Sequence, residues 1–203
     1  LMDIIYMLTK LQDTDFFAKS DEIAVYLRVQ SGGIMQKKLS VVCLLGFMGC
    51  GKSTVGKELA SLVGAEFTDL DEYVVEREGR SIPDMFRDGE QTFRNAEMAA
   101  LEDYLTEENA SSIRVLALGG GTPTIPGAVE LVLERTSSVY LRCNFTTIIS
   151  RIGIEDPSRP LSSDATRLYA SRLPLYERAF LKIDVDGKTP RQIAEEIREA
   201  LLP

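Results

Sequence analysis

A glycine-rich stretch near residue 50 constrains the fold of this chain more than any other feature. Residues 46–53 read GFMGCGKS, which fits the pattern G-x-x-x-x-G-K-[ST], and they lie between an apolar run at 39–45 and a helix-like stretch at 54–63. The glycines let backbone N–H groups turn towards a phosphate, and the helix presents its positive end to the same anion. Because strand, loop and helix follow in the order that a P-loop requires, a chance glycine-rich turn is the weaker interpretation. We predict a nucleoside triphosphate site in which Lys52 reaches the phosphates and Ser53 ligates Mg²⁺.

The composition excludes several classes of function. A formal net charge of −8 argues against nucleic acid as the main partner, because a phosphate backbone attracts a basic face. The chain has no histidine, which excludes Ser-His-Asp hydrolysis and His-ligated metals, so a general base has to be a carboxylate, lysine, cysteine or tyrosine. No apolar stretch is long enough to cross a bilayer, and the three cysteines lack disulfide or zinc spacing. We expect a soluble protein of the reducing cytoplasm, without a membrane or nucleic-acid partner.

The first 34 residues differ from the rest of the chain. They begin with Leu1, carry a mixed segment at 13–22 and end near the flexible pair Gly32-Gly33. They lack the basic region and continuous apolar core of a signal peptide. We expect residues 1–34 to be an N-terminal extension, of upstream or cloning origin, to which the sequence assigns no role. Residues 35–203, with enough apolar side chains for one core, form the predicted catalytic domain.

Apolar β-like runs alternate with helical patterns from residue 39 onwards. Strands that are buried on both faces and connected by helices form a doubly wound parallel sheet, so the sequence predicts an α/β fold. Ligands of such sheets bind at the carboxyl ends of the strands. The strands are predicted at 39–45, 66–68, 113–118, 138–143 and 182–185, and the helices at 53–63, 72–78, 81–109, 128–135, 146–152, 164–180 and 190–202.

The second predicted strand ends in Asp69-Leu70-Asp71. Residues two apart on an extended chain point to the same side, so both carboxylates should face the P-loop. One can hold Mg²⁺ through water, and the other can bind substrate hydroxyls or take a proton from the attacking one. The alternative is that the two acids only cap and begin the next helix, where aspartate is favoured.

The third predicted strand ends in three consecutive glycines, Gly119, Gly120 and Gly121. Such a run suits a place where the backbone approaches a ligand closely and offers N–H donors. A flexible turn is the alternative.

Two further arginines are candidates for binding an anion. Arg94 and Glu97 are i, i+3 neighbours on a predicted helix, so the carboxylate can orient the guanidinium, although a surface salt bridge is the usual meaning of such a pair. Arg172 precedes Pro174, which is expected to kink its helix for the site or merely for packing.

A segment without apolar periodicity extends from residue 151 to 163. A loop of this length is typical of a lid, and Arg159 within it could stabilise charge on a transferring phosphoryl group when the lid closes. The alternative is a surface loop with an idle arginine.

The motifs GFMGCGKST, DLD, FRNAE, GGGT, RPL and RLPLY occur in one order, and this ordered set resembles the shikimate kinase family from about residue 39 to the C-terminus. The resemblance implies a three-layer α/β P-loop kinase with a five-stranded parallel sheet flanked by helices, plus a lid. It implies a monomer that transfers the γ-phosphoryl group of ATP, with Mg²⁺, to the 3-hydroxyl of shikimate in chorismate and aromatic amino-acid biosynthesis.

The same resemblance implies a role for each matched residue. Asp71 grips the shikimate hydroxyls and accepts the proton, Asp69 reaches the metal through water, and Glu97 orients Arg94. The implied catalytic residues are Lys52, Asp71 and Arg159; the implied ATP-binding residues are Gly49, Cys50, Gly51, Lys52, Ser53, Thr54, Arg151 and Arg159. Those implied for shikimate are Asp71, Arg94, Gly119, Gly120, Gly121 and Arg172, with Phe86 and Phe93 beside its ring, and those for the metal are Ser53 and Asp69.

Cys50 departs from the alanine or serine that is usual in this family. Its place near a helix N-terminus favours a reactive thiolate, whereas a side chain turned into the core would be inert. The lid also departs from the family, because Ser162 follows Leu161 where a second leucine is common.

Two other classes of function compete with this interpretation. A gluconate or nucleoside monophosphate kinase would keep Lys52 and Ser53 but would not need the two arginines and the DLD motif. A P-loop regulatory switch for guanine nucleotides would need an N-K-x-D motif, which the chain lacks.

Overall fold

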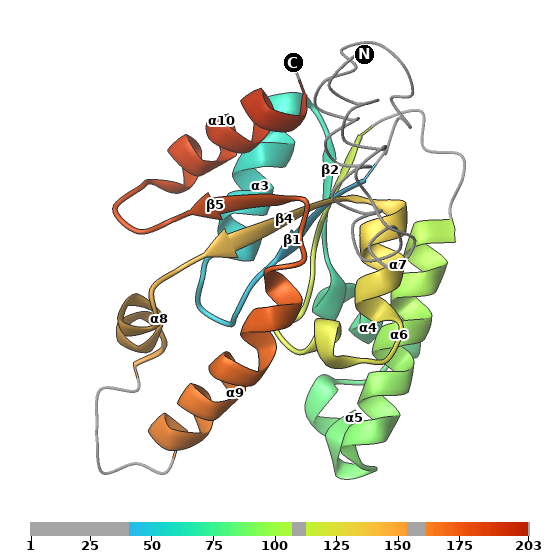
Figure 1. The fold of residues 1–203 in the computed structure, drawn as a ribbon. Coiled ribbons are helices and arrows are strands. Elements are labelled where there is room, and N and C mark those ends of the chain that lie inside the picture. The colour runs from blue at the N-terminus through green and yellow to red at the C-terminus, as the bar shows by residue number, and fades with distance from the viewer. Residues whose placement is uncertain (1–40, 107–112, 154–160, 203) are drawn as a thin grey trace, which may run out of the picture. The chain divides into compact units, whose positions relative to one another are not determined.

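Five segments pair side by side as parallel strands in the computed structural model, which describes residues 41–106, 113–153 and 161–202. The sheet order is β2-β3-β1-β4-β5, so the P-loop strand lies at the centre (Figure 1). The predicted five-stranded parallel sheet is confirmed. Its strands are β1 (Val41–Leu45), β2 (Glu66–Asp69), β3 (Arg114–Ala117), β4 (Ser137–Arg142) and β5 (Leu181–Asp184).

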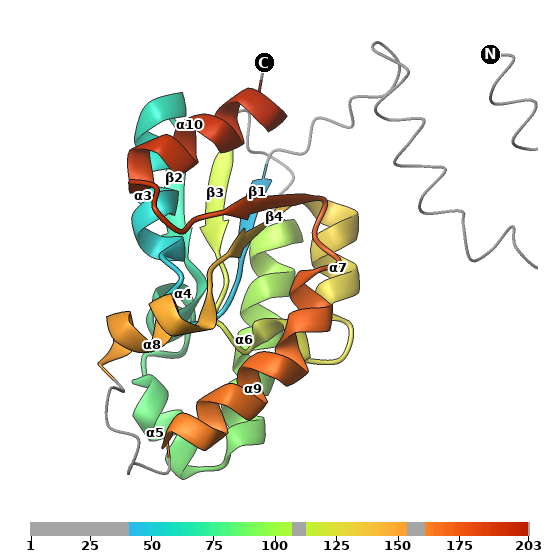
Figure 2. The ribbon, with the colours of Figure 1, turned by 60° about the vertical axis from the view of Figure 1, so that its left-hand side comes forward.

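Helices cover both faces of the sheet and make three layers. Helices α3 (Lys52–Val63) and α10 (Pro190–Leu201) pack together on one face, while α6 (Glu90–Thr106) and α7 (Ala128–Arg135) lie on the other (Figure 2). The remaining elements lie towards or beyond the carboxyl edge of the sheet. They are α4 (Leu70–Glu78), α5 (Ile82–Arg87), η1 (Thr122–Thr124), α8 (Phe145–Ile152) and α9 (Leu161–Tyr176).

The central strand of the sheet, β1, is fully buried. Every residue of β1 is at most 3% exposed, because helices cover both of its faces, and this explains the continuous apolar run in the sequence. The carboxyl ends of β2, β3 and β1 lie next to one another. Ala117, at the end of β3, pairs with Asp69 of β2 on one side and with Leu44 of β1 on the other. The loops that follow these three strands therefore meet at one edge.

The structure corrects the single helix predicted over 81–109. Helix α5 ends at Arg87, and α6 begins at Glu90. Between them Gly89 adopts a φ of 117°, in the region that L side chains rarely enter, so the helix cannot continue through it. The Asp88-Gly89 dipeptide was the overlooked signal.

The helix predicted over 164–180 ends earlier in the structure. Helix α9 includes Pro174 and stops at Tyr176, four residues before the predicted end. Proline has no N–H, so α9 lacks the hydrogen bond from position 174 to the carbonyl of Ala170. The predicted lid lies mostly outside the described residues, and so does Arg159.

Candidate functional site

The P-loop adopts backbone angles that only glycine tolerates well. Gly46, Gly49 and Gly51 have φ values of 146°, 76° and 102°. The side chain of Lys52 folds over the loop, where its Nζ donates to the carbonyl oxygens of Gly46 at 2.9 Å and Phe47 at 3.2 Å. These angles turn the backbone around a small space, as the binding of a phosphate requires.

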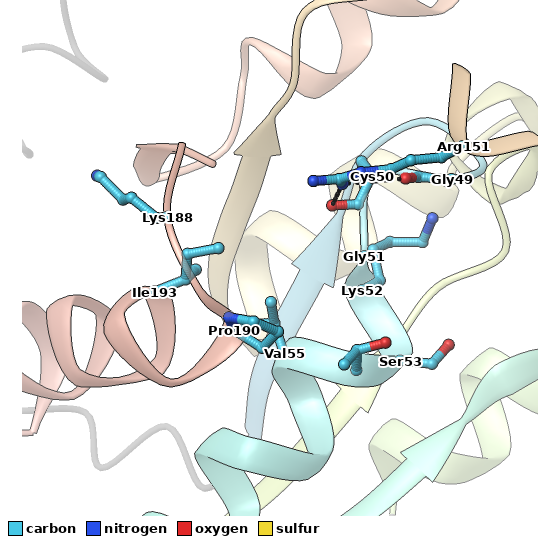
Figure 3. A pocket seen from close by; sticks show the side chains of 11 residues that line it. Gly49, Cys50, Gly51, Lys52, Ser53, Val55, Arg151, Lys188, Pro190 and Ile193 are labelled. Atoms are coloured by element: carbon cyan, nitrogen blue, oxygen red, sulfur yellow. Dashed lines mark hydrogen bonds between the residues drawn. The ribbon is translucent and has the colours of Figure 1, made fainter. Parts of the chain in front are cut away.

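A cavity of about 420 Å³ opens beside this loop. It contains the predicted ATP-binding residues of the P-loop and Arg151 of α8 (Figure 3). Four lining residues were not predicted: one is Val55 of α3, and the other three, Lys188, Pro190 and Ile193, come from the segment after β5 and the start of α10. Their signal was available, because this segment also follows the carboxyl end of a parallel strand. The full lining is Gly49, Cys50, Gly51, Lys52, Ser53, Thr54, Val55, Arg151, Lys188, Pro190 and Ile193.

Arg151 lies over the P-loop, as Figure 3 shows. Its Nη1 is 3.3 Å from the carbonyl oxygen of Gly49 and 3.4 Å from that of Cys50. The guanidinium is thereby held at the wall of the cavity, where it can contact a nucleotide.

Ser53 and Asp69 meet as predicted. The Ser53 hydroxyl donates to Asp69 Oδ2 at 2.6 Å. A hydroxyl beside a carboxylate fits Mg²⁺, which takes few protein oxygens and keeps water and phosphate ligands. Among the described residues, no cluster of three or more His, Cys, Asp or Glu side chains forms a separate metal cage.

The structure corrects the extended-chain argument for Asp71. Strand β2 ends at Asp69, and Asp71 already lies in the first turn of α4. Asp69 caps this helix, because its Oδ1 accepts from the Asp71 N–H at 3.1 Å. The capping alternative is therefore correct, and the cap itself holds the two acids close together, while their separate roles stay a prediction.

The half-buried Asp71 carboxyl has an unusual proton affinity. Burial, and then the negative charges of Glu97 and Asp69, raise its pKa to about 6, against the opposing effect of Lys52 and Arg94. Such a pKa suits a group that accepts a proton near neutral pH.

Each of the three consecutive glycines makes room for another part of the site. A Cβ on Gly119 would lie 2.7 Å from Asp71 Oδ1, and one on Gly121 would lie 2.8 Å from both terminal nitrogens of Arg94. A Cβ on Gly120 would lie 3.1 Å from the Met48 backbone nitrogen. None of the three has a positive φ, so they are needed for close approach and not for a turn conformation.

Arg94 is held from two sides. Its Nη1 donates to Glu97 Oε2 at 2.6 Å, and Glu97 is fully buried, so this pair is not the surface salt bridge of the alternative interpretation. On the solvent side, Arg94 Nη2 contacts the exposed Glu90 at 3.2 Å. The guanidinium also lies 5.2 Å above the ring of Phe93, which contacts the exposed ring of Phe86.

Arg172 is buried, and no carboxylate in the described part of the chain pairs with it. It is 8% exposed, its Nε has no hydrogen-bond partner, and no ion pair to it occurs among the described acidic residues. Its guanidinium carbon lies 5.8 Å from the centre of the Phe47 ring, and its Nη1 lies 3.8 Å from the Cβ position of Gly120. A buried cation of this kind is suited to bind an anion that enters from outside.

The structure decides the orientation of Cys50. Its side chain is 1% exposed, and its Sγ fills the space beside Gly46. The inert alternative therefore fits, and the reactive-thiolate hypothesis does not, because a reagent has no access to the sulfur.

Comparisons with known proteins agree on one family. A family model described as shikimate kinase matches residues 48–202. The shikimate kinase of Streptococcus gordonii is 41% identical over 163 residues, which cover 76% of this chain and 96% of that protein. The enzyme of Thermus thermophilus is 37% identical over 167 residues, with coverage of 79% and 89%. The solved structure of shikimate kinase from Acinetobacter baumannii in complex with shikimate superposes with a TM-score of 0.71 at 32% identity, covering 80% of this chain and 92% of that one.

Proposed function

The chain belongs to the shikimate kinase family and catalyses the ATP-dependent phosphorylation of shikimate in aromatic biosynthesis, and from this premise we propose how its residues divide the reaction. The observation that carries the proposal is the place of Asp71. Its carboxyl lies close enough to Lys52, of the P-loop, and to Arg94, of α6, for both positive charges to lower its pKa. A hydroxyl bound at Asp71 therefore lies between the phosphate cradle and the cations for a carboxylate.

On the nucleotide side, the P-loop backbone and Lys52 bind the β- and γ-phosphates, and Arg151 contacts the base end of ATP in the cavity of about 420 Å³. Ser53 and Asp69 would hold Mg²⁺. When bound, this ion neutralises charge on the phosphates. Arg159, outside the described residues, is assigned to the phosphates by sequence alone.

On the substrate side, Arg94 and Arg172 bind the single carboxylate of shikimate, and the backbone of the Gly119–Gly121 run forms the adjoining wall. Asp71 accepts the proton of the 3-hydroxyl of shikimate while the oxygen of that hydroxyl attacks the γ-phosphorus. The bond from that phosphorus to the β–γ bridging oxygen breaks, and ADP leaves. Positioning and positive charge carry most of this reaction, so the absence of histidine is no obstacle.

A coupled assay of ADP release tests the proposal. We expect the fastest turnover with shikimate and slower turnover with quinate, which shares the ring carboxylate and the 3-hydroxyl but carries an additional hydroxyl. Gluconate and nucleoside monophosphates should give little or none, because they lack a ring carboxylate for the two arginines in fixed relation to a hydroxyl for Asp71. Equal stimulation of ADP release by gluconate, or no stimulation by shikimate, would contradict the assignment of Arg94, Arg172 and Asp71 to shikimate.

We also propose that residues 35–203 are sufficient for catalysis, because every residue placed in the site lies after residue 45. A chain truncated to begin at Met35 should fold and phosphorylate shikimate within about twofold of the full rate. Kinetics of the two purified chains, with circular dichroism as the folding control, give the answer. A folded but inactive truncation would show that residues 1–34 contribute to the site.

We further propose that the enzyme acts as a monomer in the reducing cytoplasm. The residues assigned to ATP and those assigned to shikimate all come from the same chain. The three cysteines of the sequence are free, as expected in the reducing cytoplasm. Within the described residues, no helix is both long and apolar enough to cross a membrane.

A further inference from the structure

The Glu97 carboxylate, which orients Arg94, has itself a second partner. Glu97 is fully buried, and a buried carboxylate is destabilising unless both of its oxygens accept hydrogen bonds. Its Oε2 accepts from Arg94 Nη1 at 2.6 Å. Its Oε1 accepts from the hydroxyl of Thr122, which is also fully buried. Thr122 therefore completes the hydrogen bonding of Glu97.

The proton of the Thr122 hydroxyl has two possible acceptors, because the carbonyl oxygen of Gly119 lies 3.0 Å away. That carbonyl already accepts from the Thr122 backbone N–H at 3.2 Å. An ionised carboxylate is also the stronger acceptor of the two. The Thr122 hydroxyl therefore donates its hydrogen bond to Glu97 rather than to the Gly119 carbonyl.

Among the side-chain atoms nearest to Gly119, the Thr122 hydroxyl is the donor to Glu97. The space around Gly119 is bordered by Asp71 Oδ1, Glu97 Oε1 and Thr122 Oγ1. An ionised Asp71 is an acceptor only, so of these three groups Thr122 alone can donate.

The other support of Arg94 is weaker. Its partner Glu90 has a side chain that is 68% exposed, so water and salt screen this pair, whereas the Glu97 side chain is 1% exposed. The orientation of Arg94 thus depends on Glu97, and Glu97 depends on Thr122.

We propose that Thr122 is a positioning residue for shikimate, whose hydroxyl fixes Glu97 and thereby aims the Arg94 guanidinium at the substrate carboxylate. The inference rests on the proposed role of Arg94. Because Thr122 is fully buried, it acts on the substrate through Glu97 and Arg94 and not by direct contact.

The test is steady-state kinetics of Thr122→Val, which keeps the shape of the side chain and removes the hydroxyl. Loss of a hydrogen bond to a charged group should raise the KM for shikimate by about 10- to 100-fold. The KM for ATP and kcat at saturating shikimate should stay within about twofold. Thr122→Ser, which keeps the hydroxyl, should restore the KM, and Thr122→Ala serves as a second hydroxyl-free variant if the valine does not fold.

Thr136→Val is the matched control. Thr136 is 2% exposed, and its hydroxyl donates to the Val132 carbonyl at 2.7 Å at the end of α7, away from the site. This variant should lower the melting temperature without raising the KM for shikimate.

A second background shows whether Thr122 acts through Arg94. In an Arg94→Ala chain, Thr122→Val should raise the KM for shikimate no further, because there is no guanidinium left to aim. A further rise there, an unchanged KM in Thr122→Val, or an equal rise for both substrates would overturn the inference. An Arg94→Ala chain with the wild-type KM would instead overturn the proposed role of Arg94, and the inference with it.

Discussion

Replacement of Asp71 by asparagine is expected to lower kcat by roughly 10²- to 10⁴-fold, the range that a positioned general base contributes. The amide keeps the size of the side chain but cannot accept the hydroxyl proton. Shikimate should still bind, since Arg94 and Arg172 are unchanged. Rapid-quench or coupled kinetics measure kcat, and calorimetric titration measures the affinity for shikimate.

Asp69→Asn is the matched comparison. Asparagine caps helices as well as aspartate does, so α4 and the position of Asp71 should be preserved while the charge for Mg²⁺ is lost. Raised Mg²⁺ should partly restore this variant and should not restore Asp71→Asn. The reverse pattern would mean that the two roles are exchanged.

The pH profile of the unsubstituted enzyme gives a further readout of Asp71. Because the pKa of its carboxyl is raised to about 6, the deprotonated form is present above that pH and is lost as the pH falls through it. We expect kcat/KM to decline below about pH 6, and this limb to be absent from the residual activity of Asp71→Asn. A profile that is flat to pH 5 would contradict the assignment of Asp71 as the proton acceptor.

Arg172→Met is expected to weaken shikimate binding and at the same time to stabilise the fold. Arg172 is 8% exposed and pairs with no carboxylate in the segments that the structure describes, so its charge is costly to bury, and an apolar side chain of similar size removes that cost. The free energy of unfolding should rise by about 1 kcal/mol, which corresponds to roughly 2–4 °C in Tm. The KM for shikimate should rise by about 10- to 100-fold, with little change in the KM for ATP.

Arg178→Met controls for the loss of a positive charge in the same region. Arg178 is exposed and pairs with Glu130 at 2.7 Å, so its removal should change neither Tm nor KM appreciably. Differential scanning calorimetry and kinetics on both variants decide. A destabilised Arg172→Met chain with normal shikimate affinity would show that Arg172 is a structural residue.

The sequence predicted those parts of the fold and site that depend on local pattern. Apolar runs buried on both faces predicted the sheet, and the P-loop pattern predicted the loop between β1 and α3. The Ser53–Asp69 and Arg94–Glu97 contacts also followed the motifs, and the structure shows both. The Arg94–Glu97 contact joins residues three positions apart on one helix. The Ser53–Asp69 contact joins residues at or just after the carboxyl ends of two strands of one parallel sheet.

The features that escaped prediction depend on tertiary contacts. Whether Cys50 points inwards depends on the neighbouring space at Gly46, which no local pattern reports. The partnership of Thr122 with Glu97 joins residues 25 positions apart. The end of the fifth predicted strand could have pointed to the segment after β5, but which of its residues line the cavity, such as Lys188 and Pro190, depends on how α10 packs on α3.

The wall of backbone at Gly119–Gly121 also bears on inhibitor design. A compound that hydrogen-bonds to main-chain groups there binds atoms that every substitution except one to proline retains. Adding a side chain at Gly119 or Gly121 would bring its Cβ within 2.8 Å of Asp71 or Arg94, so a substitution that excluded the compound would also displace groups on which the enzyme depends. Resistance by point mutation should therefore arise more readily at the nucleotide end, where side chains such as those of Lys188 and Ile193 form the lining, than at this wall.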